Sequence, residues 1–169
     1  MKIVLLGYMA SGKSTIGVIL GKKLNIQFID LDTFIEEKEQ LSISEIFKQK
    51  GEIYFRKKEG EYLSELLDSE NDLIISLGGG TPCYGNNMNK IQELSTSFYL
   101  NASINTIFER LKDEKTQRPL VTNIGEHNLK EYIAKHLFER NEFYKKATNS
   151  IDINDKSAFQ IIEEIVDLL

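Results

Sequence analysis

The chain has 169 residues, 41% hydrophobic and 28% charged, a composition typical of one folded globular domain and not of a disordered or fibrous chain. Its 21 basic and 26 acidic side chains give a net charge of −5 at pH 7 and are scattered along the sequence, which argues against nucleic acid or an anionic membrane as a partner. The single cysteine, Cys83, excludes an internal disulfide and a cysteine-rich zinc site, which indicates a reducing compartment such as the cytoplasm.

Short apolar runs alternate with longer runs of helical periodicity. The apolar runs predict strands at Ile3–Leu6, Gln27–Ile29, Leu73–Leu77, Ser97–Leu100 and Ser150–Ile153. Continuous apolar strands such as Leu73–Leu77 suit a sheet that helices cover on both faces. The alternation of strands and helices therefore predicts an α/β fold with a central parallel sheet.

The first strand leads into a phosphate-binding pattern, G-x-x-x-x-G-K-S, which runs from Gly7 to Ser14. The helix predicted over Ser14–Leu24 gives the motif the strand, loop and helix that it requires. Backbone amides and the helix N-terminus supply positive potential for a phosphate, Lys13 reaches the β- and γ-phosphates, and the Ser14 hydroxyl suits Mg²⁺. The motif predicts nucleotide binding, and the guanine-reading pattern N-K-x-D of switch GTPases is absent from the sequence.

Two carboxylates, Asp30 and Asp32, follow the second strand at the edge of the sheet where ligands bind in open α/β folds. Alternation along the chain would turn Asp30 toward a metal ion and Asp32 toward a substrate hydroxyl, whose proton it could accept during in-line attack. The alternative is that Asp32 caps the helix predicted over Thr33–Glu39. These residues alone leave both interpretations open.

Two helices are expected next along the chain. The capping-box spacing of Ser42 and Glu45 predicts a helix that begins near Ile43, and a second helix is predicted from Gly51–Glu52 to Asp68. In the second, Arg56 and Glu59 share one face, so that the glutamate can fix the guanidinium group for two-pronged binding of a carboxylate. An exposed surface ion pair is the alternative.

Three consecutive glycines, Gly78, Gly79 and Gly80, follow the third strand. They cost conformational entropy without helping the fold, so they predict close approach of a ligand to the backbone. The polar segment between Leu111 and Gly125, which contains Arg118, interrupts the helical periodicity and is interpreted as a lid.

The last third of the chain returns to helical periodicity. Arg140 begins the run Arg140–Ala147 at a helix end, and Ala158–Leu169 carries an apolar stripe typical of an amphipathic helix packed on the sheet. Two histidines, His127 and His136, are expected on helical surface, and we assign no function to them or to Cys83. The phenylalanines and Tyr99 are expected in the core.

Taken in order, the P-loop, D-x-D, F-R-x-x-E, G-G-G, R-P-L and R-x-x-x-Y resemble the shikimate kinase family over essentially the whole chain. The resemblance implies one kinase domain, 1–169, with a three-layer αβα fold and a five-stranded parallel sheet in the order 2-3-1-4-5. It also implies a substrate-binding segment at about 32–60 and a lid at about 112–125. The implied activity is phosphorylation of the 3-hydroxyl of shikimate by ATP, in the biosynthesis of chorismate and the aromatic amino acids, by a monomer with Mg²⁺ as cofactor.

The resemblance further implies roles for individual residues. The residues implied in catalysis are Asp32, Lys13 and Arg118. Those implied in ATP binding are Gly7, Ala10, Ser11, Gly12, Lys13, Ser14, Thr15, Arg110, which would stack on adenine, and Arg118. The sequence departs from the family pattern on the far side of the adenine, where the expected arginine is absent from 154–156 and Lys156 is the candidate. Those implied in shikimate binding are Asp32, Arg56, Gly78, Gly79, Gly80 and Arg140, with Glu59 orienting Arg56. The Mg²⁺ ligands would be Ser14 and, through water, Asp30.

Two alternatives remain at this point. A gluconate kinase or a nucleoside monophosphate kinase would share the phosphate loop but not the acid-binding arginines. A nucleotide-binding regulatory module that has lost catalysis would more often lack one of Asp30, Asp32 and Lys13, all of which are present.

Overall fold

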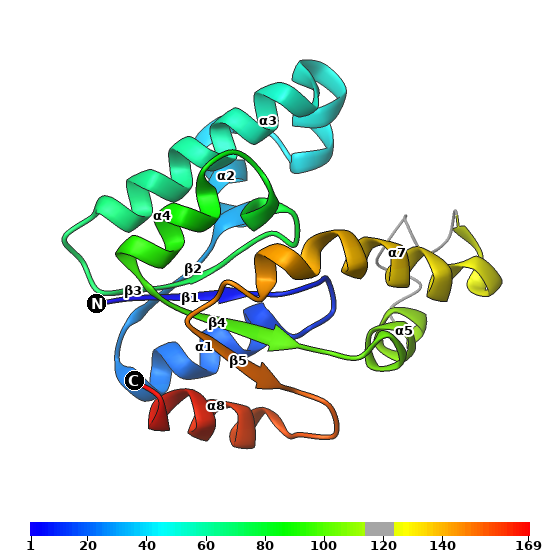
Figure 1. Cartoon of the computed structure of the whole chain (residues 1–169). Coiled ribbons are helices and arrows are strands. Elements are labelled where there is room, and N and C mark those ends of the chain that lie inside the picture. The colour runs from blue at the N-terminus through cyan, green and yellow to red at the C-terminus, as the bar shows by residue number, and fades with distance from the viewer. Residues whose placement is uncertain (114–123) are drawn as a thin grey trace.

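Five parallel strands form the centre of the computed structural model, which describes residues 1–113 and 124–169 (Figure 1). They pair in the order β2-β3-β1-β4-β5, which confirms the predicted order 2-3-1-4-5. The strands are β1 (Lys2–Leu6), β2 (Gln27–Asp30), β3 (Leu73–Ser76), β4 (Thr96–Asn101) and β5 (Asn149–Asp152). Because all of them run in one direction, the loops that follow β1, β2 and β3 meet at one edge of the sheet.

Helices cover both faces of the sheet, so the predicted three-layer αβα architecture is confirmed (Figure 1). α1 and α8 lie on one face, and α3 and α4 lie on the other. In chain order the helices are α1 (Lys13–Leu24), α2 (Leu31–Glu39), α3 (Ile43–Asp68), the short 3-10 helix η1 (Thr81–Cys83), α4 (Asn87–Leu94), α5 (Ile104–Asp113), α7 (Glu126–Tyr144) and α8 (Ala158–Asp167). Over the described ranges, no helix has the length and apolarity needed to cross a lipid bilayer.

The start of α2 differs from its prediction. The helix begins at Leu31 because the carboxylate of Asp30 caps it, accepting from the backbone N–H groups of Asp32 at 3.1 Å and of Thr33 at 3.4 Å. The interpretation of Asp32 as the cap is therefore wrong, and so is strand alternation as the reason for its direction, because Asp32 lies in the first helical turn. Asp32 is thus left available for another role.

The two helical pieces predicted over residues 43–68 are present in α3, with a kink between them at Gly51. This residue has φ 84° and ψ 171°, a conformation that only glycine adopts without strain. The capping box at the start of α3 is confirmed, with the Glu45 backbone N–H donating to the Ser42 hydroxyl oxygen at 3.2 Å and Ser42 N–H donating to the Glu45 carboxylate at 2.8 Å. The kink sets the direction of the second piece, which carries Arg56.

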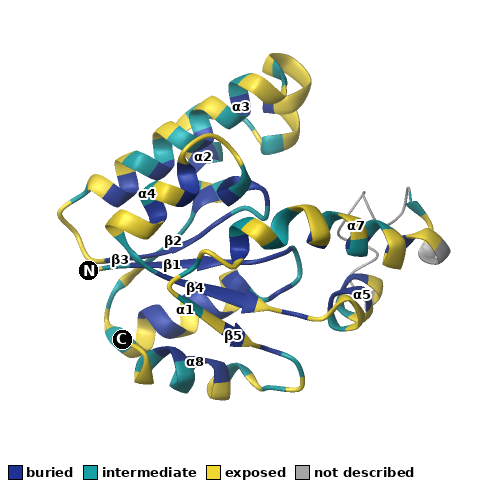
Figure 2. Ribbon diagram, viewed as in Figure 1, coloured by how far each residue is buried: buried dark blue, intermediate teal, exposed yellow. Residues whose placement is uncertain are grey.

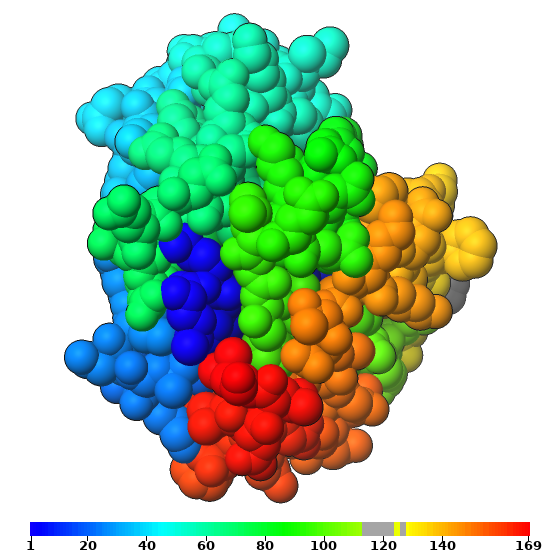
Figure 3. Space-filling view, turned by 60° about the vertical axis from the view of Figure 1, so that its left-hand side comes forward, coloured from blue at the N-terminus to red at the C-terminus, as the bar shows by residue number. Residues whose placement is uncertain are grey.

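The core lies between the sheet and its covering helices, where β1, β3 and β4 are almost entirely buried (Figure 2). Tyr99 is buried as predicted, but the expectation for the phenylalanines is wrong at Phe138 and Phe159, which are 85% and 69% exposed on helix surfaces. Helical periodicity alone does not show which face of a helix lacks a neighbour. Figure 3 shows the first residues of the chain at the surface, where the amino terminus forms an ion pair with Asp72.

Candidate active site

The phosphate loop is folded around the ammonium group of Lys13. This group is buried and donates to the carbonyl oxygens of Gly7 and Tyr8 at 2.9 Å each, and to the Ser11 hydroxyl at 3.4 Å. Gly7 is required at its position, because a Cβ atom there would lie 2.9 Å from the backbone oxygen of Leu100. The loop therefore holds the ammonium group of Lys13 against its own backbone, at the wall of a cavity.

A cavity of about 480 Å³ opens above this loop, at the carboxyl ends of β1, β2 and β3. Its walls combine the loop, both predicted carboxylates, part of the glycine turn and the start of α8. The lining residues are Met9, Ala10, Ser11, Gly12, Lys13, Ser14, Thr15, Ile16, Asp30, Asp32, Ser76, Leu77, Gly78, Gly79, Arg110, Ala158 and Ile161. Parallel strand ends thus bring together residues that lie far apart in the sequence.

Ser14 and Asp30 lie next to each other in the lining of the cavity and are hydrogen-bonded. The Ser14 hydroxyl donates to Oδ2 of Asp30 at 2.7 Å, while Oδ1 of the same carboxylate caps α2. Hydroxyl and carboxylate oxygens are the donor types that Mg²⁺ prefers. Within residues 1–113 and 124–169, no group of three or more His, Cys, Asp or Glu side chains could hold a metal ion, so a cation here would also need oxygens from a nucleotide or water.

Asp32 is a cavity carboxylate whose pKa is raised. Burial, reinforced by the negative charges of Asp30 and Glu59, raises the pKa of Asp32 to about 6, and the charge of Lys13 opposes this rise. Glycine at position 78 is needed beside it, because a Cβ atom there would lie 3.0 Å from Oδ1 of Asp32. A carboxylate with a pKa near neutrality is suited to accept a proton from a substrate hydroxyl.

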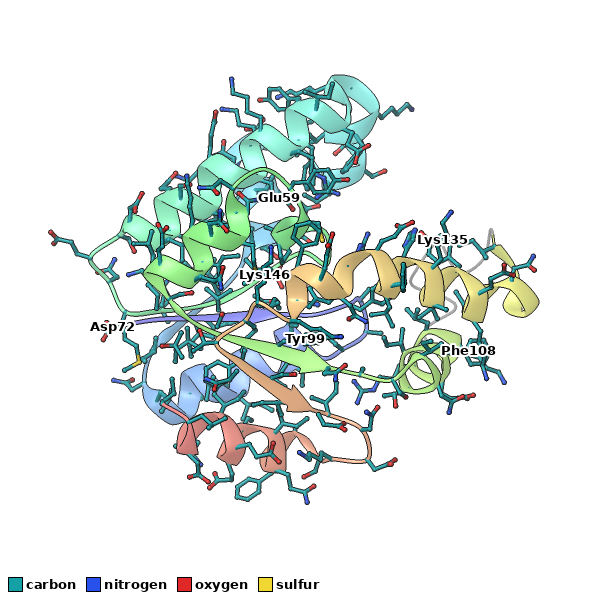
Figure 4. All side chains as sticks on the ribbon, in the orientation of Figure 1. Glu59, Asp72, Tyr99, Phe108, Lys135 and Lys146 are labelled. Atoms are coloured by element: carbon teal, nitrogen blue, oxygen red, sulfur yellow. The ribbon has the colours of Figure 1, made fainter. Side chains whose placement is uncertain are left out.

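Arg56 and Glu59 form the pair that their spacing predicts, in the interior and not on the surface. Nη1 of Arg56 donates to Oε2 of Glu59 at 2.8 Å, and the Glu59 side chain is only 1% exposed. The hydroxyl of Thr81, also buried, donates to Oε1 of Glu59 at 2.7 Å. Figure 4 shows Glu59 on the side of α3 that faces α4. With both its oxygens engaged, Glu59 holds Arg56 in one orientation.

One buried nitrogen of Arg56 has no hydrogen-bond partner in the described part of the chain. This atom, Nε, lies 3.7 Å from the nearest carboxylate oxygen, Oε1 of Glu52. A buried donor without an acceptor is costly, so such a group usually has a partner or binds a ligand. Nε is therefore an unsatisfied buried donor, which singles out Arg56 as a candidate for ligand binding.

The glycine turn gives room to side chains of the protein itself. A Cβ atom on Gly79 would lie 3.3 Å from Nη1 of Arg140, and one on Gly80 would lie 3.0 Å from Nη2 of Arg56. Gly80 has φ −92° and ψ −18°, which any residue adopts, so space is what it provides. Close approach to the backbone was predicted for a ligand; the structure adds two guanidinium groups that lie against the same turn.

Arg140 is surrounded by aromatic residues. Its guanidinium carbon lies 5.5 Å from the ring centre of Tyr8, and one helical turn later the hydroxyl of Tyr144 donates to the carbonyl oxygen of Gly79 at 2.5 Å. His136, for which only a surface position was expected, has Nδ1 3.4 Å from the Tyr8 hydroxyl. The spacing R-x-x-x-Y could have identified Tyr144, whereas nothing local in the sequence connects Tyr8 to α7.

The remaining predicted residues have different outcomes. Arg110 lines the cavity and donates from Nη1 to the carbonyl oxygen of Ala10 at 3.0 Å, whereas Lys156 is absent from the lining and forms an ion pair with Glu164. Arg118 and most of the predicted lid, 112–125, lie outside the described residues.

Burial raises the pKa of the Cys83 thiol, which disfavours its reactive thiolate form.

Comparisons with known proteins agree with one another. The family model for shikimate kinase matches residues 9–169. The shikimate kinase of Flavobacterium johnsoniae is 50% identical to the chain over 169 residues, which cover 99% of this chain and 98% of the relative. The crystal structure of shikimate kinase from Bacteroides thetaiotaomicron has a TM-score of 0.92 at 34% identity, over 99% of this chain and 97% of that one. Shikimate kinase from Acinetobacter baumannii in complex with shikimate has a TM-score of 0.87 at 29% identity, over 99% of this chain and 91% of that one.

Proposed function

Because the chain belongs to the shikimate kinase family, we propose an assignment of its residues to the two substrates and to the chemical step. The enzyme uses ATP to phosphorylate the 3-hydroxyl of shikimate, which yields shikimate 3-phosphate and ADP on the route to chorismate and the aromatic amino acids. One observation carries the assignment: the cavity of the phosphate loop ends at a glycine turn against which Arg56 and Arg140 lie.

ATP is assigned to the cavity above the phosphate loop. The loop amides and Lys13 would hold the β- and γ-phosphates, and Arg110, which lies over Ala10, would face the adenine. The assigned nucleotide-binding residues are Gly7, Ala10, Ser11, Gly12, Lys13, Ser14, Thr15 and Arg110. When bound, Mg²⁺ would be held by Ser14 and, through water, by Asp30, and would neutralise charge on the phosphates.

Shikimate is assigned to the space between the glycine turn and the second piece of α3. Its carboxylate would accept hydrogen bonds from Arg56, whose buried Nε has no partner in the described part of the chain, and from Arg140. Glu59 would keep Arg56 oriented for this contact. The turn Gly78–Gly80 would lie against the ring, so that the acceptor hydroxyl reaches Asp32. The substrate-binding segment is proposed at about 32–60 of a single domain, 1–169.

The chemical step needs positioning and charge neutralisation and no covalent enzyme intermediate. The 3-hydroxyl oxygen of shikimate would attack the γ-phosphorus in line, and the bond from that phosphorus to the β,γ-bridging oxygen would break, with ADP as the leaving group. Asp32, with a pKa near 6, would accept the proton of the hydroxyl, and Lys13 would stabilise charge on the transferred group. The role of Arg118 in this step stays a prediction from the sequence.

The test is ADP release by the purified protein with Mg-ATP, alone and with shikimate, gluconate or AMP as acceptor. Stimulation by shikimate alone is expected. Stimulation by gluconate or AMP and not by shikimate would overturn the assignment of Arg56 and Arg140, and no stimulation by any acceptor would favour a regulatory nucleotide-binding module. We also propose that the enzyme is a monomer, which sedimentation of the pure protein would test. We propose a cytoplasmic location, which cell fractionation would test.

A further inference from the structure

An exposed tyrosine lies on the partly buried guanidinium group of Arg56. The Cζ atom of Arg56 lies 4.0 Å from the ring centre of Tyr84, closer than the 5.0 Å to the neighbouring ring of Phe55. Tyr84 directly follows η1, and 39% of its surface is exposed, so the ring is not part of the core. A ring face this close to a guanidinium group attracts its charge and restricts its movement.

Tyr84 is attached to the helix that carries Arg56. Its hydroxyl donates to Oε1 of Glu52 at 3.1 Å, and Glu52 lies one helical turn before Arg56 in α3. The backbone N–H of Tyr84 points to the carbonyl oxygen of Thr81 at 3.5 Å, so the residue is anchored to η1 as well. Tyr84 therefore contacts both η1 and α3.

The other sides of the guanidinium group are occupied by residues already described. Glu59 holds Nη1 at 2.8 Å, and a Cβ atom on Gly80 would lie 3.0 to 3.4 Å from Nη2, Nη1 and Cζ. The ring of Tyr84 covers a further side of the guanidinium group, which Glu59 and Gly80 do not cover. Nε has no hydrogen-bond partner among the described residues. This enclosure would hold the arginine in a single rotamer before any ligand arrives.

We propose that Tyr84 is a positioning residue for the acceptor: it holds Arg56 for the carboxylate of shikimate and so lowers the entropy cost of binding that acid. The inference rests on the proposed role of Arg56 in binding shikimate. It predicts an effect on shikimate binding and not on the phosphoryl transfer step, because Tyr84 does not line the nucleotide cavity. The hydroxyl contributes less than the ring, since its bond to Glu52 is exposed.

Steady-state kinetics of three variants test the proposal. Tyr84→Leu removes the ring face and is expected to raise KM for shikimate about 3- to 30-fold, the range that corresponds to a cation–π contact, with kcat and the KM for ATP changed less than about twofold. Tyr84→Phe keeps the ring and is expected to stay within about threefold of wild type. Phe159→Leu removes an exposed ring beside Lys23, a matched surface pair, and should leave the KM for shikimate unchanged.

Three results would overturn the proposal: equal losses in Tyr84→Leu and Tyr84→Phe, a fall in kcat with an unchanged KM for shikimate, or wild-type kinetics in Tyr84→Leu. If the wild-type protein itself does not phosphorylate shikimate, the proposed function fails. If the wild type does so and Tyr84→Leu behaves like it, only the present inference fails.

A direct reporter of the contact is possible because the sequence contains no tryptophan. Tyr84→Trp keeps an aromatic face on Arg56, so it should retain the affinity for shikimate and provide the sole tryptophan of the chain, which can be excited separately from the tyrosines. Shikimate is expected to change this fluorescence with saturation, and the methyl ester of shikimate, which lacks the charge, is expected to do so only at much higher concentration. An equal response to acid and ester, or no response to either, would contradict the contact.

Discussion

Asp32→Asn should make the folded protein more stable at neutral pH while it abolishes turnover. Burial raises the pKa of Asp32 from 3.8 to about 6, which means that the folded state resists the ionised form. A group with a raised pKa contributes its full stability below about pH 4, where it is protonated in both states, and loses that contribution as the pH rises through about 6. Asparagine has nearly the same shape and never ionises.

The size of the effect follows from the two pKa values. They differ by about 2, and one pKa unit corresponds to about 1.4 kcal/mol, so the free energy of unfolding should rise by about 3 kcal/mol at pH 8. At pH 5 the wild-type carboxyl is mostly protonated when folded, and the gain should fall to about half of that value. Turnover should be lost at both pH values, since an amide cannot accept the hydroxyl proton.

Urea unfolding followed by circular dichroism, without ATP or Mg²⁺, measures the stability of both proteins at pH 5 and pH 8, and ADP release measures turnover. Asp72→Asn is the matched control, because Asp72 is an exposed carboxylate whose pKa the amino terminus lowers, so no gain at pH 8 is expected there. If Asp32→Asn does not raise the free energy of unfolding at pH 8, or raises it equally at the two pH values, burial of the charged form is refuted as the cause.

Three further substitutions test the assignment of the site. Lys13→Met should remove nearly all ADP release, because it removes the only ammonium group in the phosphate loop; a normal rate would exclude Lys13 from the site. Arg56→Ala should weaken shikimate binding by about 2–5 kcal/mol in a calorimetric titration, since it removes the proposed partner of the substrate carboxylate and leaves Glu59 without its cation, and unchanged affinity would exclude Arg56. Gly80→Ala places a Cβ atom 3.0 Å from Nη2 of Arg56 and should raise KM for shikimate severalfold without changing that for ATP. An unaltered KM would show that Arg56 does not need this space.

Much of the fold and site could be predicted because the signals are local. The phosphate loop is defined by consecutive residues, and the pairing of Arg56 with Glu59 follows from helical spacing, so the strand–loop–helix arrangement and the ion pair are both confirmed, while nucleotide binding by the loop residues stays a prediction. Sheet order came from resemblance to a family and is confirmed as well. In each case, one short segment of sequence, or one strand order known from a family, is enough to predict the feature.

The errors and omissions involve contacts between distant segments or a shift of two residues in the start of a helix. The cap of α2 is Asp30 and not Asp32, because the helix starts two residues earlier than its apolar pattern indicates. Thr81 and Tyr84 were missed, since their contacts with Glu59 and Arg56 depend on how η1 packs against α3. Nothing in the sequence near Phe138 shows that its side chain is exposed on α7.

The carboxylate of Asp30 connects the phosphate loop to the helix that carries Asp32. One oxygen accepts from Ser14 at the floor of the nucleotide cavity, and the other starts the helix whose first turn carries Asp32. If a cation binds as proposed and draws the Ser14 hydroxyl away from Asp30, it would also change the electrostatic surroundings of Asp32. On that proposal, occupancy of the nucleotide site and the pKa of Asp32 would be linked thermodynamically, and mutation of Asp30 would alter both.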